Sequence, residues 1–192
     1  DLNRSAPGHP ESESYEMRRA AELVAKANSH PYYVDLHGSH KPTGVFLILS
    51  RPTEAQLQFA SHFDVDRIVW FRPDPHTVSG TLVAHHPMGV AIESGCQGAA
   101  SIRTKLAGVI ERLLDADLKQ QDGWRERLAQ KELYIFEGAI YDHPKEPLAE
   151  FQPYTWEGET FHALFVGSHD GAVAYKLRKV NLETLIAADA RE

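Results

Sequence analysis

Apolar residues along the first 130 positions change their spacing several times, from helical to strand-like and back. Between Glu13 and Asn28 they recur at helical spacing, which predicts an amphipathic helix that ends before Pro31. The segments Tyr32–Leu36 and Gly44–Leu49 are short and apolar on both faces, as strands covered by helices are. Further strands are expected at 67–71 and 88–93, and further helices at 53–63 and 102–114. This alternation predicts an α/β fold, with a mostly parallel or mixed sheet and flanking helices.

The pattern changes after about Lys131. The remaining chain contains strand-like runs, with His169–Gly171 as a tight-turn signal between the last two: 133–141, 160–167 and 172–180. We therefore expect a catalytic α/β domain at 1–130 and a small β-rich cap domain at 131–192. In the first of these, Thr53 and Gln56 have the spacing of a capping box that opens a helix.

Composition narrows the class of protein. The chain has 192 residues, 42% of them apolar and 24% charged, which is typical of a globular protein with a real core. The formal net charge of -7 argues against nucleic acid, and the basic run Lys176–Lys179 is too short to change that. The sequence shows no bilayer-length apolar run and no signal peptide, and its one cysteine, Cys96, excludes an internal disulfide framework. We expect a cytoplasmic protein without nucleic-acid or membrane partners; a homo-oligomer is left open.

An acid and a histidine end the first predicted strand. Asp35 and His37 are two residues apart, so on a strand they project from the same side. Histidine is the commonest metal-binding side chain, and open α/β folds bind ligands at the carboxyl ends of their strands. The pair therefore indicates either a structural hydrogen bond or part of a metal site.

A second acid, Glu93, closes the strand predicted at 88–93. A buried carboxylate is unfavourable unless it is paired, solvated or used, and burial can raise its pKa towards that of a useful base. The segment alone fits both a catalytic carboxylate and a Glu that emerges into solvent.

Cys96 and the first residues give weaker signals. Cys96 could be the nucleophile of a Cys-His hydrolase, in which His37, His85 or His86 would serve as the base. An isolated cysteine, however, is more often a small core residue. At the start of the chain, the guanidinium fork of Arg4 and the amide of Asn3 could grip a carboxylate, although most arginines lie in solvent.

These motifs together carry a resemblance. The chain contains, in order, DLNR at 1–4, YEMRRA at 15–20, YVDLH at 33–37, GVFLIL at 44–49 and GVAIESGCQG at 89–98, followed by a long helix. In this order and spacing they resemble the aspartoacylase and succinylglutamate desuccinylase family, which has the zinc carboxypeptidase-like fold. The resemblance covers residues 1 to about 118, and the C-terminal unit agrees in type.

The resemblance implies a metal centre and a base. His37 would be one ligand of Zn²⁺, Asp35 would be its second-shell partner, and Glu93 would be the general base and acid. Zinc would lower the pKa of a bound water and polarise the amide carbonyl, while Glu93 moves the proton to the departing amine.

The resemblance also implies substrate contacts. Asn3 and Arg4 would hold a carboxylate of the substrate. Tyr175 and Lys179, in the last predicted strand, would close over it.

The sequence departs from the family pattern in three places. The His-x-x-Glu motif that supplies the other two zinc ligands stands upstream of DLNR in the family and does not occur here. Because residues 1–4 have the pattern of a strand end, we expect a preceding segment that carries these ligands. The segment Thr77–His86 lacks the Arg that grips a second carboxylate, although His85 or His86 could supply a weaker charge, and Gly38–Ser39 differs beside the site.

We therefore expect a zinc-dependent amidohydrolase that removes an acyl group from a small N-acyl amino acid, such as N-acyl aspartate. One alternative is a non-catalytic or truncated family member that binds carboxylates through Arg4. The other is a zinc carboxypeptidase, because an Arg and a Glu base suit both reactions. A β-rich cap that narrows the channel favours the deacylase.

Overall fold

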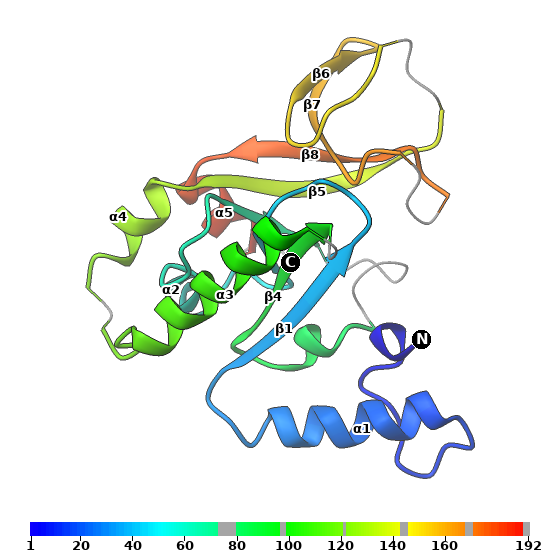
Figure 1. The fold of residues 1–192 in the computed structure, drawn as a ribbon, viewed down its shortest axis with the longest axis vertical. Helices are drawn as coiled ribbons and strands as arrows, with labels where there is room; N and C mark the ends of the chain where they lie inside the picture. Colours follow the sequence, from blue (N-terminus) through cyan, green and yellow to red (C-terminus); the bar gives the residue numbers. More distant parts are fainter. Residues whose placement is uncertain (73–79, 97–98, 121, 143–145, 168–170, 190–192) are drawn as a thin grey trace.

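The structure is a computed structural model of residues 1–192, and it describes every residue except 73–79, 97–98, 121, 143–145, 168–170 and 190–192 (Figure 1). The strands are β1 (Tyr33–Ser39), β2 (Phe46–Leu49), β3 (Arg67–Trp70), β4 (Gly89–Cys96), β5 (Glu132–Ile140), β6 (Pro153–Trp156), β7 (Glu159–Leu164) and β8 (Ala174–Val180). The helices are α1 (Tyr15–Ala27), α2 (Glu54–Ala60), α3 (Ala100–Asp115), α4 (Trp124–Ala129) and α5 (Leu182–Asp189), with short 3-10 turns η1 (Leu2–Arg4) and η2 (Leu82–His85).

The strands of the described residues form one 8-stranded sheet, in the order β1-β4-β2-β3-β5-β8-β7-β6. Strand β4 lies between β1, to which it runs parallel, and β2, to which it runs antiparallel. Strands β2, β3 and β5 run parallel to one another, and β5, β8, β7 and β6 pair antiparallel. The predicted α/β class is confirmed, and the sheet is mixed.

The two faces of the sheet bury different cores. One face carries aliphatic residues such as Leu47 and Ile92 and is covered by residues of α2, α3, α4 and α5. The other carries an aromatic core, which includes Phe46 and Phe71 and is covered by Phe151 and Phe165. Both faces are buried, which is why the central strands are apolar at consecutive positions. The candidate site lies on the aromatic face.

Strand β5 connects the two predicted domains. It pairs with β3 on one side and with β8 on the other, so one sheet continues across the predicted domain boundary. Beyond it, residues of β5, β7 and β8 form a small separate core: Ile140, Phe161, Ala163 and Ala174. The division into 1–130 and 131–192 stays a prediction.

The start of the chain differs from the prediction of a strand end. Leu2–Arg4 form a 3-10 turn, in which the Asp1 carboxylate accepts the Asn3 N–H at 2.9 Å. The Ser5 N–H donates to the Leu2 carbonyl at 3.2 Å. These local bonds close a turn, so the backbone is not extended and the strand prediction is wrong.

Other local predictions fare differently. The Gln56 N–H donates to Thr53 Oγ1 at 3.2 Å, which confirms the cap of α2. The Gln56 side chain does not complete the box, because its amide donates to the Gly89 carbonyl at 2.5 Å. The turn predicted at His169–Gly171 lies largely outside the described residues. Within the described part of the chain, none of the helices has the length and apolar character to cross a membrane; the cytoplasmic location and the oligomeric state stay predictions.

Candidate active site

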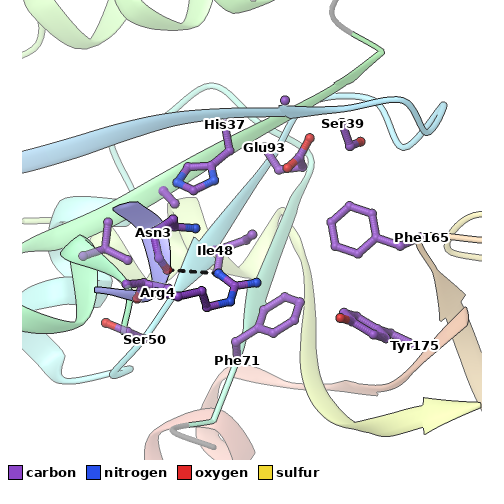
Figure 2. A pocket seen from close by; sticks show the side chains of 14 residues that line it. Asn3, Arg4, His37, Ser39, Ile48, Ser50, Phe71, Glu93, Phe165 and Tyr175 are labelled. Atoms are coloured by element: carbon purple, nitrogen blue, oxygen red, sulfur yellow. Dashed lines mark hydrogen bonds between the residues drawn. The ribbon is translucent and has the colours of Figure 1, made fainter. Parts of the chain in front are cut away.

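His37 and Glu93 lie side by side because strands β1 and β4 bring them into register. His37 pairs with Glu93 across the parallel strands, and Phe46 of β2 pairs with Glu93 from the other side. Register partners point to the same face of a sheet, so the imidazole and the carboxyl group share one surface. Glu93 is 5% exposed, whereas the His37 side chain is 27% exposed. Figure 2 shows the two groups next to each other at the pocket.

Asp35 orients His37. Its Oδ2 lies 3.0 Å from His37 Nε2, as their spacing of two residues on β1 allows. The hydrogen bond to Asp35 raises the pKa of His37, and the Asp35 and Glu93 charges act in the same direction against the opposing effect of burial. Because Asp35 engages Nε2, a ligand of this histidine would bind the other ring nitrogen, Nδ1.

Glu93 has the surroundings of a general base. Burial raises the pKa of its carboxyl group, and hydrogen bonds from Gly95 and Ser39 together with the His37 charge offset part of that rise. The Gly95 N–H donates to Glu93 Oε1 at 2.8 Å, which holds the carboxyl group in one orientation. A fixed carboxylate with a raised pKa is suited to accept and return a proton.

The end of β4, just after Glu93, requires the glycine at position 95. Gly95 has a φ of +65°, and a Cβ there would lie 2.8 Å from both the Lys41 carbonyl oxygen and Thr43 Oγ1. The β1–β2 loop therefore packs directly against the backbone that holds Glu93. A side chain at this position would disturb both.

The turn η1 brings Asn3 and Arg4 to the pocket. The Ala6 N–H donates to the Gly80 carbonyl at 3.0 Å. Gly80 packs so closely that a Cβ would lie 2.5 Å from the Arg4 carbonyl oxygen. Arg4 Nη1 donates to the Asn3 carbonyl at 3.0 Å, the dashed line in Figure 2. Asn3 Oδ1 is buried and has no hydrogen-bond partner within the described structure.

These residues line a common pocket of about 190 Å³. The polar side is formed by His37, Glu93, Asn3 and Arg4, and the opposite wall is apolar. The remaining described lining residues are Gly38, Ser39, Ile48, Ser50, Phe71, Thr81, Val83, Ala91, Phe165 and Tyr175. The sequence prediction therefore placed five residues in this pocket: Asn3, Arg4, His37, Glu93 and Tyr175.

Lys179 is not brought to the pocket. Tyr175 is 7% exposed and lines it, but Lys179 lies four residues further, roughly 13 Å along β8. There its ammonium group contacts the Glu132 carboxylate at 2.5 Å. The ammonium group that was expected to contact the substrate therefore pairs with Glu132 instead.

The pocket lining also does not include Cys96, His85 or His86. Cys96 is an exposed free cysteine. His86 is 5% exposed; its Nε2 donates to the His30 carbonyl at 3.1 Å, and its Nδ1 accepts the Met88 N–H at 3.0 Å. His86 is therefore a structural histidine and does not supply the weaker charge that the sequence suggested.

The metal donors in the described part of the chain are incomplete. No group of three His, Cys, Asp or Glu side chains able to hold a metal ion occurs there, whereas a catalytic zinc takes three protein ligands. His37, oriented by Asp35, has the features of one such ligand. Two others would have to come from outside the described residues.

Sequence reasoning missed the aromatic wall of the pocket. Phe71 follows β3 and Phe165 follows β7, and both are mostly buried. Phenylalanine at a strand end is typical of an ordinary core, so the residue type gives no functional signal. The backbone at Phe165, with a φ of 54°, is equally invisible in the sequence.

Comparisons with known proteins agree on the fold. No family model and no curated protein sequence matches the chain. Murine aminoacylase 3 aligns with a TM-score of 0.65 at 19% identity, over 94% of this chain and 77% of that one. Succinylglutamate desuccinylase from Chromobacterium violaceum gives 0.62 at 18%, over 95% and 67%. A product-bound ectoine utilization protein from Ruegeria pomeroyi gives 0.57 at 16%, over 94% and 61%. The chain has the fold of these proteins, so the predicted resemblance is confirmed at the level of the fold.

Proposed function

We propose that this protein is an amidohydrolase that removes the acyl group from an N-acyl amino acid, for which the sequence suggests N-acyl aspartate. The observation that carries the proposal is the position of Glu93. It is a buried carboxyl group with a raised pKa, beside a histidine held by Asp35. Arg4 lines the same pocket as a carboxylate-binding group.

In this mechanism, the Arg4 guanidinium binds the carboxylate of the amino-acid part and so fixes the amide against the reacting groups. Glu93 takes a proton from the attacking water and later delivers it to the nitrogen of the departing amine. The products are a carboxylate and a free amino acid.

Zinc is the proposed cofactor. Bound through His37 and ligands from outside the described residues, it would lower the pKa of water and polarise the amide carbonyl. Asp35 then serves to keep His37 in the tautomer and orientation that a metal requires.

Two further observations support a small substrate. The pocket measures about 190 Å³, which suits a small molecule better than a peptide and favours a deacylase over a zinc carboxypeptidase. Phe165 and Tyr175, from the segment predicted as a cap, form part of its wall. The similar solved structures include an aminoacylase and a desuccinylase.

The proposal is tested by amine release from N-acyl amino acids, with zinc per chain measured on the same sample. We expect Glu93→Gln to lower kcat at least about 100-fold with the metal content unchanged, because it removes the base and no ligand. Glu183→Gln, on α5, is the matched control and should leave turnover as it is. Equal turnover of Glu93→Gln and wild type would exclude the assigned base.

The incomplete donor set favours a second candidate, a non-catalytic protein that binds carboxylates through Arg4. Such a protein would hold no zinc after desalting and would release no amine, yet would bind N-acyl amino acids. Arg4→Gln would weaken that binding. Cleavage of C-terminal residues from peptides would instead favour the carboxypeptidase.

A further inference from the structure

The apolar wall of the pocket is unsuited to a second negative charge. Ile48, Phe71, Phe165 and Tyr175 form it, and Figure 2 shows Phe165 and Tyr175 together, across the pocket from Asn3. Arg4 is the only Lys or Arg among the described lining residues, and the sequence from 73 to 86 contains neither. A second carboxylate on the substrate would lie unpaired against aromatic rings, which is unfavourable.

Phe165 is held in place by an unusual backbone. Its φ of 54° lies in the left-handed region that side chains rarely adopt. The Phe165 N–H donates to Glu150 Oε2 at 2.9 Å, and the Val166 N–H donates to Glu150 Oε1 at 2.8 Å. Both carboxylate oxygens of Glu150 thus fix one short segment. Non-glycine residues in this conformation persist only where the surroundings impose it, and they cluster at functional sites.

A second group, from the β1–β2 loop, holds the same segment. The Lys41 ammonium, in the β1–β2 loop, donates to the Gly167 carbonyl. That loop also packs against Gly95, behind Glu93. The segment that carries Phe165 and the backbone next to the proposed base therefore both contact the β1–β2 loop.

The rings are packed edge to face, which leaves a defined apolar surface. Phe165 and Tyr175 have ring centroids 5.7 Å apart at 82°, and Phe71 lies 6.2 Å from Tyr175 at 67°. Phe165 is only 5% exposed. Burial raises the pKa of Glu150, and its two N–H donors oppose that rise, so its carboxyl group is committed to the backbone.

We propose that Phe71, Phe165 and Tyr175 form a subsite for an uncharged apolar group of the substrate, and that Glu150 is the positioning residue that sets this subsite. The inference rests on the proposed function and narrows it: the preferred substrate carries one carboxylate, bound by Arg4, and an aromatic or branched aliphatic group. The deacylase reaction is kept, whereas the N-acyl aspartate that the sequence suggests would be a poor substrate.

Binding to the hydrolysis-deficient Glu93→Gln protein tests the subsite directly. The ligands are N-acetyl-L-phenylalanine, N-benzoylglycine and N-acetyl-L-aspartate, measured by titration calorimetry. We expect one of the two apolar ligands to bind at least about tenfold more tightly than the aspartate derivative, because burial of one aromatic group changes affinity by that order. Which of the two binds more tightly shows whether the subsite takes the side chain or the acyl group. Equal affinities, or tighter binding of N-acetyl-L-aspartate, would overturn the proposal without any substitution in the wall.

Variants then assign the subsite to its residues. Phe165→Ala and Glu150→Ala, each added to Glu93→Gln, should reduce the preference to within about twofold while leaving the aspartate derivative's affinity unchanged. Glu150→Gln, which keeps one acceptor oxygen, should retain part of it. Glu159→Gln is the control, since Glu159 forms a surface ion pair with Lys176. A merely structural Glu150 would weaken all three ligands equally. If Phe165→Ala fails to fold, Phe165→Leu should lower the preference for the tighter-binding of the two phenyl-containing ligands over the aspartate derivative.

Turnover by the wild-type protein separates the two proposals. Selective binding without amine release from any ligand would contradict the proposed hydrolase and leave the subsite standing. Amine release at equal kcat/KM from all three ligands would contradict the subsite and leave the hydrolase standing.

Discussion

At the scale of single residues, the site contains a carboxyl group whose ionised form is disfavoured by burial in the folded chain. Glu93 is 5% exposed, and burial is the largest cause of its raised pKa. A group whose pKa is higher in the folded chain binds protons more tightly there. Its protonated form therefore contributes stability at low pH, and this contribution is lost as the pH rises from about 4.5 through the folded-state pKa.

Glu93→Gln should accordingly be more stable than the wild type at pH 8, and the difference should shrink as the pH falls towards 4.5. The amide is uncharged at every pH, so the variant escapes the loss that ionisation causes. Urea unfolding of both metal-free proteins across this range measures it. A variant that is less stable at pH 8 would show that the hydrogen bonds to Gly95 and Ser39 outweigh burial.

Asp35→Asn should lower the pKa of His37, because the hydrogen bond to Asp35 is the largest cause of its rise. The raised pKa stabilises the fold below about pH 6.5, and this stability is lost as the pH rises through the folded-state value. The wild type should therefore exceed the variant in unfolding free energy most at acidic pH. NMR titration of the metal-free proteins reports the pKa. Loss of the orienting carboxylate should also lower activity roughly 10- to 100-fold.

At the scale of elements, the end of β4 packs against the β1–β2 loop. Gly95 combines a φ of +65° with a close approach of the β1–β2 loop. Gly44 has a φ of +75°, but no atom lies within 4 Å of the position that a Cβ would take. Strain in the backbone acts at both positions. Collision with a neighbour acts only at Gly95.

Gly95→Ala should therefore destabilise the chain more than Gly44→Ala. A left-handed residue with a side chain costs of order 1–3 kcal/mol, and the contacts at 2.8 Å add to that at Gly95 alone. Urea denaturation of the two variants compares them directly. Equal losses would mean that the Lys41–Thr43 segment moves aside freely.

The elements that could be predicted from sequence are those with strong local signals. Strands such as Phe46–Leu49 announce themselves by β-branched and apolar runs, and α2 by its Thr53 cap. Helix α4 has only six residues, and β6 begins with a proline, so neither carries a clear period. The left-handed backbone at Phe165 and the position of Lys179 arise from tertiary pairing, which no local pattern encodes.

At the scale of the whole molecule, the sheet buries a core on each face, and the candidate site lies on one of them. Helices cover the face that carries Leu47, which is fully buried. The pocket opens on the other face, among aromatic residues. The helix-covered core and the candidate site therefore draw on different side chains of the same strands.

Leu47→Ala should cost about 2–5 kcal/mol of unfolding free energy, since it leaves a cavity in the helix-covered core. Leu36→Ala is the matched control, because Leu36 is 54% exposed on β1 and should change stability by less than about 0.5 kcal/mol. Guanidinium unfolding of each variant gives both values. A large effect at Leu36 would show that this edge strand is covered in solution.

The strand order has a consequence for how the protein emerges during synthesis. Because β4 inserts between β1 and β2, these two earlier strands cannot pair with each other and must wait for a third. Until residue 96 has left the ribosome, His37 lacks β4, the strand that pairs with it in the described part of the chain, and until Tyr175 follows, the aromatic wall is incomplete. Growing chains therefore expose apolar strands for much of translation. A nascent chain that ends between Glu93 and β8 would carry His37 and Glu93 without the complete aromatic wall of the pocket.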